Sequence, residues 1–115
     1  MSIYDDAYQA FERGDLGRVR ELLEPSASAG NREAQIALGT FLTADGAAFP
    51  EGMRWLTTAA DAGYGHAAHN LASCLFSGGP GVVRDAERAA RYMQVAVDSG
   101  FEATVSSDPQ WWKGL

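Results

Sequence analysis

The chain matches itself when it is shifted along its own sequence, and this internal repeat limits the folds it can adopt. A shift of 33 residues superimposes small and apolar residues, namely Ala34, Leu38 and Leu42 on Ala67, Leu71 and Leu75. A shift of 37 superimposes a second set, namely Trp55, Ala59 and Gly63 on Tyr92, Ala96 and Gly100. The four-residue difference predicts an insertion around residues 79–84. A weaker third copy places Leu22 and Gly30 on Trp55 and Gly63. Such a period, with two helices per unit, is typical of an α-solenoid.

Apolar residues recur every three or four positions along most of the chain, which is the spacing of amphipathic helices. This spacing predicts helices over residues 4–13, from Leu16 towards Pro25, and over 32–44, 51–62, 66–77 and 86–99, with no strand. Pro25 should end or kink its helix, because proline lacks an amide hydrogen. Residues 26–30 are then one more helical turn or a loop. In the helix over 86–99, we expect Ala89, Ala90, Met93, Ala96 and Val97 to face inward.

Helix boundaries are marked by residues that start or stop helices. Asp15 and Asp85 are placed to cap helix N-termini, and Pro50 can begin the helix that follows it. Asp45–Gly46 should stop a helix, and Gly63 and Gly100 should each end one. The run Gly78–Gly81 predicts a loop. Asp108–Pro109 could start a last short helix that contains Trp111 and Trp112.

A length of 115 residues allows one domain. We expect a single α-solenoid, an all-α superhelix of antiparallel helix pairs with about two and a half repeats and a C-terminal cap. Its expected parts are an N-terminal divergent helix pair (4–31), two repeats (32–64 and 65–101) and a cap or tail (102–115). The 20 alanines and 13 glycines follow from this architecture. Small residues such as Gly39 and Ala72 let helices approach, and Gly63 and Gly100 turn the chain into the next unit.

Residues 32–101 resemble the Sel-one-like repeat family, a branch of the tetratricopeptide superfamily. The second repeat supplies most positions of that family's pattern, namely Ala67, Leu71, Ala72, Leu75, Gly79, Gly81, Val82, Asp85, Ala89, Tyr92, Ala96 and Gly100. The first repeat supplies Ala34, Leu38, Gly39, Leu42, Trp55, Ala59, Ala60 and Gly63, but it lacks the Gly-Val-x-x-Asp loop. The N-terminal pair departs from the pattern and also looks like an ankyrin helix pair.

The resemblance implies a non-catalytic protein-binding module whose partner contacts the first helix of each pair, on a concave face. It places the expected contacts at Thr40, Thr43, Asn70, Ser73 and Phe76. Small bacterial proteins with such repeats resemble immunity proteins that neutralise toxins, and this is the function we expect. The alternative is a regulatory adaptor or scaffold in signalling or envelope stress.

Charge and terminal sequence narrow the partners further. The formal charge of −6 argues against nucleic acid and favours a protein partner with a basic surface. The N-terminus lacks the basic and apolar regions of a signal peptide, and no run reaches the roughly 18 apolar residues of a membrane span. We therefore expect a cytoplasmic protein without a membrane partner, as a monomer or a homodimer.

A competing reading makes the chain a metal-binding or enzymatic protein that uses His66, His69 and Cys74. Zinc needs about four ligands, the chain has no CxxC or HExxH pattern, and the spacing places Cys74 on another side of the helix. The glycine-rich run also lacks the Lys-Ser/Thr of a phosphate-binding loop. We therefore expect no enzyme, metal or cofactor.

Trp111 and Trp112 have two possible roles. A solenoid exposes an apolar end that terminal elements must cover, so these residues could cap the fold. Tryptophan is also enriched in binding hot spots, so they could instead anchor the partner.

Overall fold

In the computed structural model, residues 2–100 can be described, all but the side chain of Ala47. Within this range the chain is all α-helical, as the sequence predicts, and has no strand beyond one isolated bridge between Gly79 and Val82. The elements are α1 (Ile3–Glu12), α2 (Leu16–Ser28), α3 (Arg32–Ala44), the short 3-10 helix η1 (Gly46–Ala48), α4 (Phe49–Asp61), α5 (Gly65–Ser77) and α6 (Ala86–Asp98). The expected helix after Asp108 lies outside the described residues.

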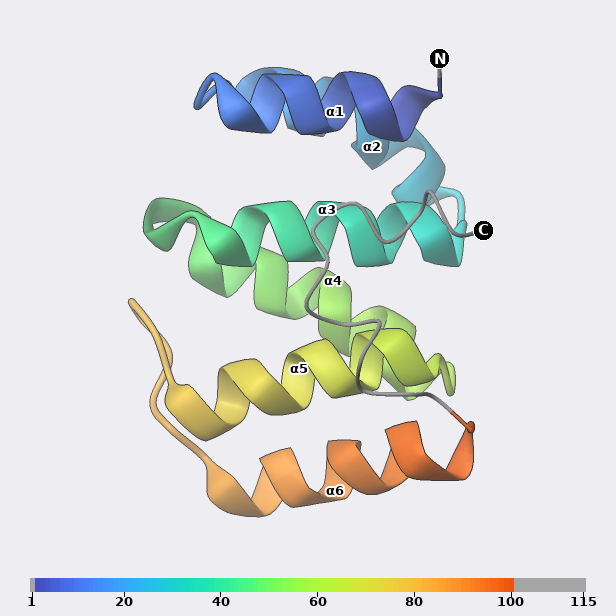
Figure 1. Cartoon of the computed structure of the whole chain (residues 1–115), viewed down its shortest axis with the longest axis vertical. Coiled ribbons are helices and arrows are strands. Elements are labelled where there is room, and N and C mark those ends of the chain that lie inside the picture. The colour runs from blue at the N-terminus through green and yellow to red at the C-terminus, as the bar shows by residue number, and fades with distance from the viewer. Residues whose placement is uncertain (1, 101–115) are drawn as a thin grey trace.

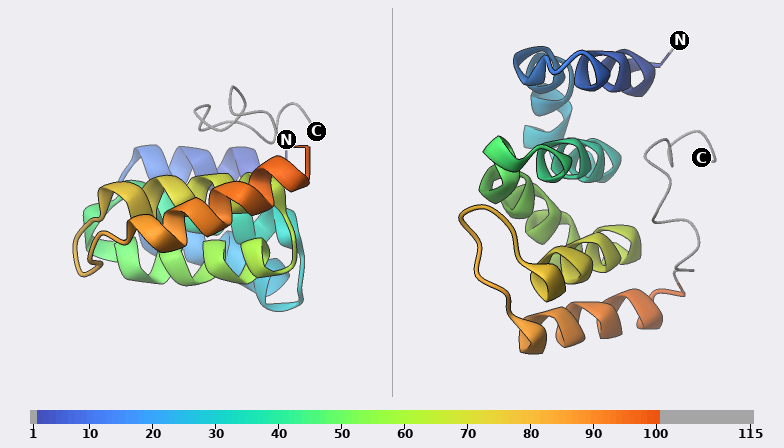
Figure 2. Two further views of the ribbon diagram at one scale, coloured as in Figure 1. Left: turned by 90° about the horizontal axis from the view of Figure 1, so that it is seen from below. Right: turned by 60° about the vertical axis from the view of Figure 1, so that its left-hand side comes forward.

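The helices form antiparallel pairs that stack along the longest dimension, within extents of 36 × 30 × 25 Å (Figure 1). We call α1, α3 and α5 the A helices and α2, α4 and α6 the B helices. The A helices lie side by side in front of α2 and α4, and each pair follows the last one down the stack (Figures 1 and 2). Each pair packs on its neighbour, because α2 contacts α3 and α4 contacts α5. The structure is therefore the superhelix of helix pairs that the repeat predicts.

Capping side chains begin α2 and α6 at the residues that the sequence predicts. Asp15 accepts a hydrogen bond from the backbone N–H of Arg18 at 3.1 Å, and Asp85 accepts one from Arg88 at the same distance. Pro50 lies in the first turn of α4, where its missing N–H leaves no bond unmade. These caps satisfy amides that have no partner inside the helix, and so they fix where each helix starts.

Pro25 does not end its helix, because α2 continues through it to Ser28. Proline frees the carbonyl four residues earlier, that of Glu21, and both Pro25 and Glu21 are exposed on the solvent side of α2. The last turn is also fixed from outside the helix. Ala27 is buried, and its carbonyl accepts a hydrogen bond of 3.0 Å from the buried amide of Gln35 in α3.

Two glycines allow α3 and α4 to cross closely. A Cβ atom added to Gly52 would lie 2.7 Å from the carbonyl oxygen of Gly39. A Cβ atom on Gly39 would lie 2.7 Å from the side chain of Leu56. The predicted role of Gly39 in close helix packing is thus confirmed. The core on both sides of this crossing contains fully buried leucines, namely Leu38, Leu42, Leu56, Leu71 and Leu75.

The apolar stripe of α6 is only partly buried, which corrects the expectation that it faces inward. Ala89 and Ala96 are buried, but Ala90 is exposed and Met93 and Val97 are 38% and 62% exposed. The reason is position in the stack. A B helix packs against its own A helix and against the next one, and no described element follows α6.

The insertion predicted in the second repeat forms the loop between α5 and α6, residues 78–85. Gly79 and Val82 exchange backbone hydrogen bonds of 3.1 and 2.9 Å. A Cβ atom on Gly79 would lie 2.6 Å from the ring of Phe49, so this loop lies against the start of α4. The glycine-rich run therefore joins the two helices of the second repeat and packs against the first repeat.

Candidate protein-binding surfaces

Thr40 and Asn70, two of the predicted contact residues, lie together across neighbouring A helices. The Asn70 side-chain amide donates a hydrogen bond of 3.2 Å to the hydroxyl of Thr40, and both side chains are half-buried. The bond links α3 to α5 and fixes the orientation of both side chains. It leaves one amide hydrogen and the amide oxygen of Asn70 for further hydrogen bonds.

The other three predicted residues are not part of this pair. Thr43 is half-buried at the crossing of α3 and α4, where its methyl group and backbone lie close to Gly52. Ser73 and Phe76 are exposed on α5 and line the groove between α5 and α6. The guanidinium of Arg84 lies 5.0 Å from the centre of the Phe76 ring. The five residues therefore fall at three separate places.

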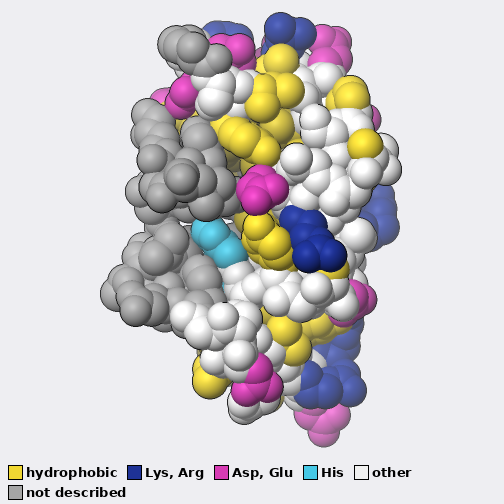
Figure 3. Space-filling model, turned by 90° about the vertical axis from the view of Figure 1, so that its right-hand side faces the viewer, with side chains coloured by type: hydrophobic (Ala, Val, Ile, Leu, Met, Phe, Trp, Pro, Cys, Tyr) yellow, Lys and Arg dark blue, Asp and Glu magenta, His cyan; other side chains and the backbone are white. Residues whose placement is uncertain are grey.

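The N-terminal ends of the A helices carry a row of aromatic and charged groups. The Tyr64 hydroxyl donates a hydrogen bond of 2.8 Å to the carboxylate of Glu33, and the Arg32 guanidinium lies 5.9 Å from the Tyr64 ring. This hydrogen bond, followed by burial, raises the pKa of Tyr64. Burial, and to a smaller extent the nearby charge of Glu33, raises the pKa of Tyr4. On the described part of this side, acidic, basic and hydrophobic groups are interspersed (Figure 3).

An apolar groove of about 460 Å³ runs between α5 and α6 at the end of the stack. Its walls are small or apolar apart from one serine: Ala72, Ser73, Phe76, Ala86, Ala89, Ala90 and Met93. Phe76, which is 58% exposed, is its largest side chain. The predicted contact residues Ser73 and Phe76 form part of its α5 side, and none of them lies on its α6 side. The 37-residue shift is the signal that could have found it, since it aligns Ala86, Ala90 and Met93 with a buried stripe of α4.

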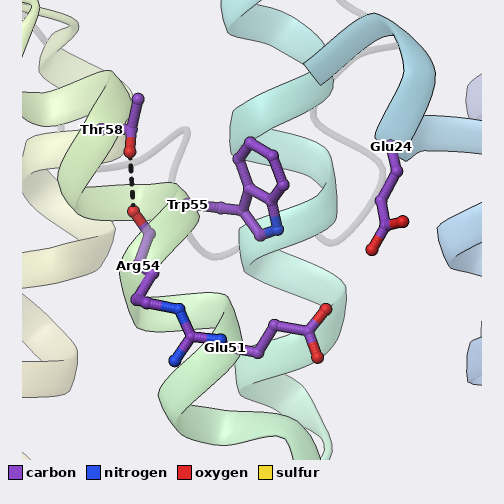
Figure 4. A pocket seen from close by; sticks show the side chains of 5 residues that line it. All are labelled: Glu24, Glu51, Arg54, Trp55 and Thr58. Atoms are coloured by element: carbon purple, nitrogen blue, oxygen red, sulfur yellow. Dashed lines mark hydrogen bonds between the residues drawn. The ribbon is translucent and has the colours of Figure 1, made fainter. Parts of the chain in front are cut away.

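A second hollow, of about 340 Å³, lies between α2 and α4 (Figure 4). Trp55 and the carboxylates of Glu24 and Glu51 face it, and Arg54 and Thr58 complete its lining. Glu51 is held by Arg20, whose guanidinium donates to its two oxygens at 2.8 and 3.0 Å. This charge-assisted bond lowers the pKa of Glu51, and the pair ties α2 to α4. Apart from Trp55, no residue of this hollow stands out in the sequence.

His66, His69 and Cys74 lie on α5 and do not gather into a metal site. In the described part of the chain, no three His, Cys, Asp or Glu side chains are grouped to hold an ion. Burial, and to a smaller extent repulsion from His69, lowers the pKa of His66 to about 4. Burial raises the pKa of the Cys74 thiol, against a smaller opposite effect of a hydrogen bond with Thr43. A thiol with a raised pKa is a weak nucleophile, because the thiolate is the reactive form.

The negative charge is unevenly distributed along the stack. Residues 2–61, which form α1 to α4, contain ten acidic and five basic residues. Residues 62–100, which form α5 and α6, contain three of each. The described excess of acid therefore belongs to the first two helix pairs, and the pair with the apolar groove has no net charge.

The comparison with protein families decides what kind of stack this is. The Sel1 repeat matches twice, at residues 32–64 and 65–101. The chain belongs to the Sel1 repeat family. These two matches are the helix pairs α3–α4 and α5–α6, so the family resemblance inferred from the sequence is confirmed. No curated protein and no solved structure matches the chain.

Sel1 repeats are generally protein-interaction modules and are typically non-catalytic. In this Sel1 protein the surfaces described above are the candidates for such an interaction. Trp111 and Trp112, the two other predicted contact residues, lie outside the described residues. Among the helices from α1 to α6, none is long and apolar enough to cross a membrane.

Proposed function

We propose that this Sel1 protein is a non-catalytic module that binds a protein partner with a basic surface on its A helices. Thr40 and Asn70 of α3 and α5 supply polar contacts near the middle of the stack. The excess of five acidic charges on α1 to α4 is the observation that supports a partner with a basic surface. Opposite charge on the partner speeds the encounter and fixes its orientation.

The partner that we propose is a toxin, and the protein is then an immunity protein that covers the toxin's active surface. Size and charge support this: a short acidic stack can cover a basic surface without any chemistry of its own. The regulatory adaptor differs from it only in the identity of the partner, so identification of the partner separates the two functions.

The test is capture of partners on the immobilised protein at low and high salt, followed by mass spectrometry. We expect a basic protein that is retained at low salt and lost at high salt, because salt screens exposed charges beyond about 10 Å at 0.1 M. Coexpression of this Sel1 protein should then restore the growth of cells that the captured protein poisons. A partner retained equally at both salt concentrations, with no effect on growth, would contradict the proposal.

A pair of matched variants tests the charge argument. Glu12→Lys changes the last residue of α1, in the acidic half, and Asp98→Lys makes the same change in the last residue of α6. A lysine in the last turn suits the helix dipole in both variants. We expect Glu12→Lys to slow association at low salt by severalfold and Asp98→Lys to have little effect. Equal effects of the two variants would show that the acidic half does not guide binding.

A further inference from the structure

The groove between α5 and α6 has a counterpart in the first repeat that is fully covered. The shift of 37 residues aligns Met93 with Leu56 and Val97 with Ala60. Met93 and Val97 are 38% and 62% exposed, whereas Leu56 and Ala60 are 0% and 2% exposed. The same face of a B helix is therefore buried in one repeat and open in the next.

In the first repeat, the following A helix provides the cover. Helix α5 packs on α4 and also touches α3, and Asn70 of α5 bonds to Thr40. The 33-residue shift aligns Thr40 with Ser73, which lines the open groove. The open groove therefore corresponds to the surface that the next A helix of the stack would cover.

The chain leaves α6 through the same turn that leads from α4 into α5. Ala62 has φ −82° and ψ 3° and is followed by Gly63 with φ 88°. Ser99 has φ −80° and ψ −7° and is followed by Gly100 with φ 80°. The backbone at Ser99 and Gly100 therefore matches the backbone at Ala62 and Gly63, where the chain turns from α4 into α5.

We propose that residues 101–115 of this same chain occupy the groove. These 15 residues are enough to span it, since α5 covers the equivalent surface with 13. The shift of 37 aligns Phe101 with the half-buried Tyr64, Val105 with the buried Ala68 and Trp112 with the buried Leu75. Pro109 would interrupt a continuous helix, so the proposal concerns the burial of apolar side chains and not a regular seventh helix.

Charge favours this occupant over a basic partner. Residues 62–100 carry equal numbers of acidic and basic side chains, so this end does not attract a charged surface. The segment 101–115 has two acidic residues and one lysine and contributes three large aromatic side chains. Its attachment at Gly100 keeps it at a high local concentration beside the groove, which a second copy of the chain lacks.

Tryptophan fluorescence tests the proposal in the full chain. In a Trp55→Phe background, Trp111 and Trp112 are the only tryptophans. We expect their emission to lie to the blue of that of the urea-unfolded chain, and Met93→Asp to shift it to the red with the helical circular dichroism unchanged. Val83→Asp is the matched control, because Val83 is 87% exposed and does not line the groove. Phe76→Asp, on the opposite wall, should act like Met93→Asp.

A full-length chain with both Trp111→Ser and Trp112→Ser supplies the second measurement. We expect Met93→Asp to lower the melting temperature by about 5 °C in the parent chain and to have little effect in the chain that lacks both tryptophans. Equal effects in both chains, or emission that Met93→Asp leaves unchanged, would overturn the proposal. A chain that is dimeric in solution, and that Met93→Asp makes monomeric, would instead identify a second copy as the occupant. No partner is needed in either measurement, so the result is independent of the proposed function.

Discussion

At the scale of single residues, the close crossing of α3 and α4 depends on two glycines, which have no side chain. Gly39 and Gly52 face each other, and each occupies space in which a methyl group would collide with the opposite helix. The equivalent residues of the second repeat are Ala72 and Ala89, so α5 and α6 accommodate methyl groups there. The two helix pairs therefore share one fold, but only the crossing of α5 and α6 has room for methyl groups at these two positions.

The variant Gly52→Ala should destabilise the protein by about 1–3 kcal/mol, the usual cost of overpacking a core. Its Cβ atom would lie 2.7 Å from a carbonyl oxygen and from the backbone nitrogen of Thr43, and backbone atoms cannot rotate away. Gly17→Ala is the control, because a Cβ atom there meets only the Asp15 carboxylate at 3.6 Å. In that exposed helical position alanine should stabilise by up to about 1 kcal/mol. Urea unfolding measures both, and equal stability of the two variants would contradict the prediction.

His66 should make stability depend on pH. Its pKa is about 4 in the folded chain, chiefly because of burial, and has its ordinary value of 6.5 in the unfolded chain. Between these values the unfolded chain binds more protons, so stability falls as the pH is lowered from 6.5 to 4. A fully shifted group gives about 1.4 kcal/mol per pH unit, and the half-buried His66 should give less.

Melting temperatures measured between pH 4 and pH 7.5 test this dependence. The variant His66→Gln should flatten the profile between pH 6.5 and pH 4, and His69→Gln should flatten it less. A profile of the same steepness in His66→Gln and in the parent chain would show that other groups cause the loss of stability.

At the scale of helices, the B helices are joined by side-chain bonds that cross between repeats. The guanidinium of Arg20 in α2 binds both oxygens of Glu51 in α4. The hydroxyl of Tyr92 in α6 donates a hydrogen bond of 2.7 Å to Asp61 at the end of α4. In each case the partners are 31 residues apart, but the two bonds lie at different positions of the repeat: Arg20–Glu51 joins the first halves of α2 and α4, and Asp61–Tyr92 joins the end of α4 to the middle of α6.

The variant Glu51→Gln should lower the free energy of unfolding by about 1 kcal/mol, because the lost ion pair is bidentate and only partly exposed. The loss should shrink at high salt. Glu21→Gln removes the exposed pair with Arg18 within α2, and it should cost no more than about 0.5 kcal/mol. If denaturation curves show equal losses for the two variants, the bond between α2 and α4 adds nothing beyond a surface ion pair.

Most helix boundaries could be predicted because local chemistry determines them. The prediction of residues 32–44 coincides with α3, and those of α4 to α6 differ from the structure by one or two residues at an end. For α2 the sequence left two outcomes open after Pro25, one more helical turn or a loop, and the structure has the helical turn, which ends at Ser28. The hydrogen bond from Gln35 of α3 to the carbonyl of Ala27 supports this turn, and a contact between helices of this kind leaves no mark in the local sequence.

The candidate surfaces could be predicted only in part, for a similar reason. Helical spacing placed Thr40, Thr43, Asn70, Ser73 and Phe76 off the core of their own helices, but not relative to the neighbouring helices. Thr43 lies at the crossing with α4 because Gly52 admits that helix closely, and Phe76 faces the groove because α6 ends the described stack. Which side of a helix stays open depends on what stacks beside it, and that is a property of the whole chain.

At the scale of the whole molecule, the protein is an acidic stack with a neutral, apolar end. Each repeat is stabilised mainly by its neighbours, so stability should grow with the number of units. A second copy of residues 65–100 inserted after Gly100 should therefore fold and raise the melting temperature. Its own α5 would cover Met93 and Val97. The control is the same insertion with Leu71→Asp in the copy, which should lose the gain. An insertion that aggregates or unfolds would contradict the prediction.

The turn made by Gly30, Gly63 and Gly100, each with positive φ, has a consequence for how such proteins arise. The turns at Gly30 and Gly63 each lead from a B helix into the next A helix, so a unit that runs from one such turn to the next has matching ends and can be repeated without a new kind of junction. A gene that encodes this protein can change length by duplication or loss of a whole unit. Each added unit lengthens the stack, so the reach of the protein can evolve separately from the chemistry of its surface.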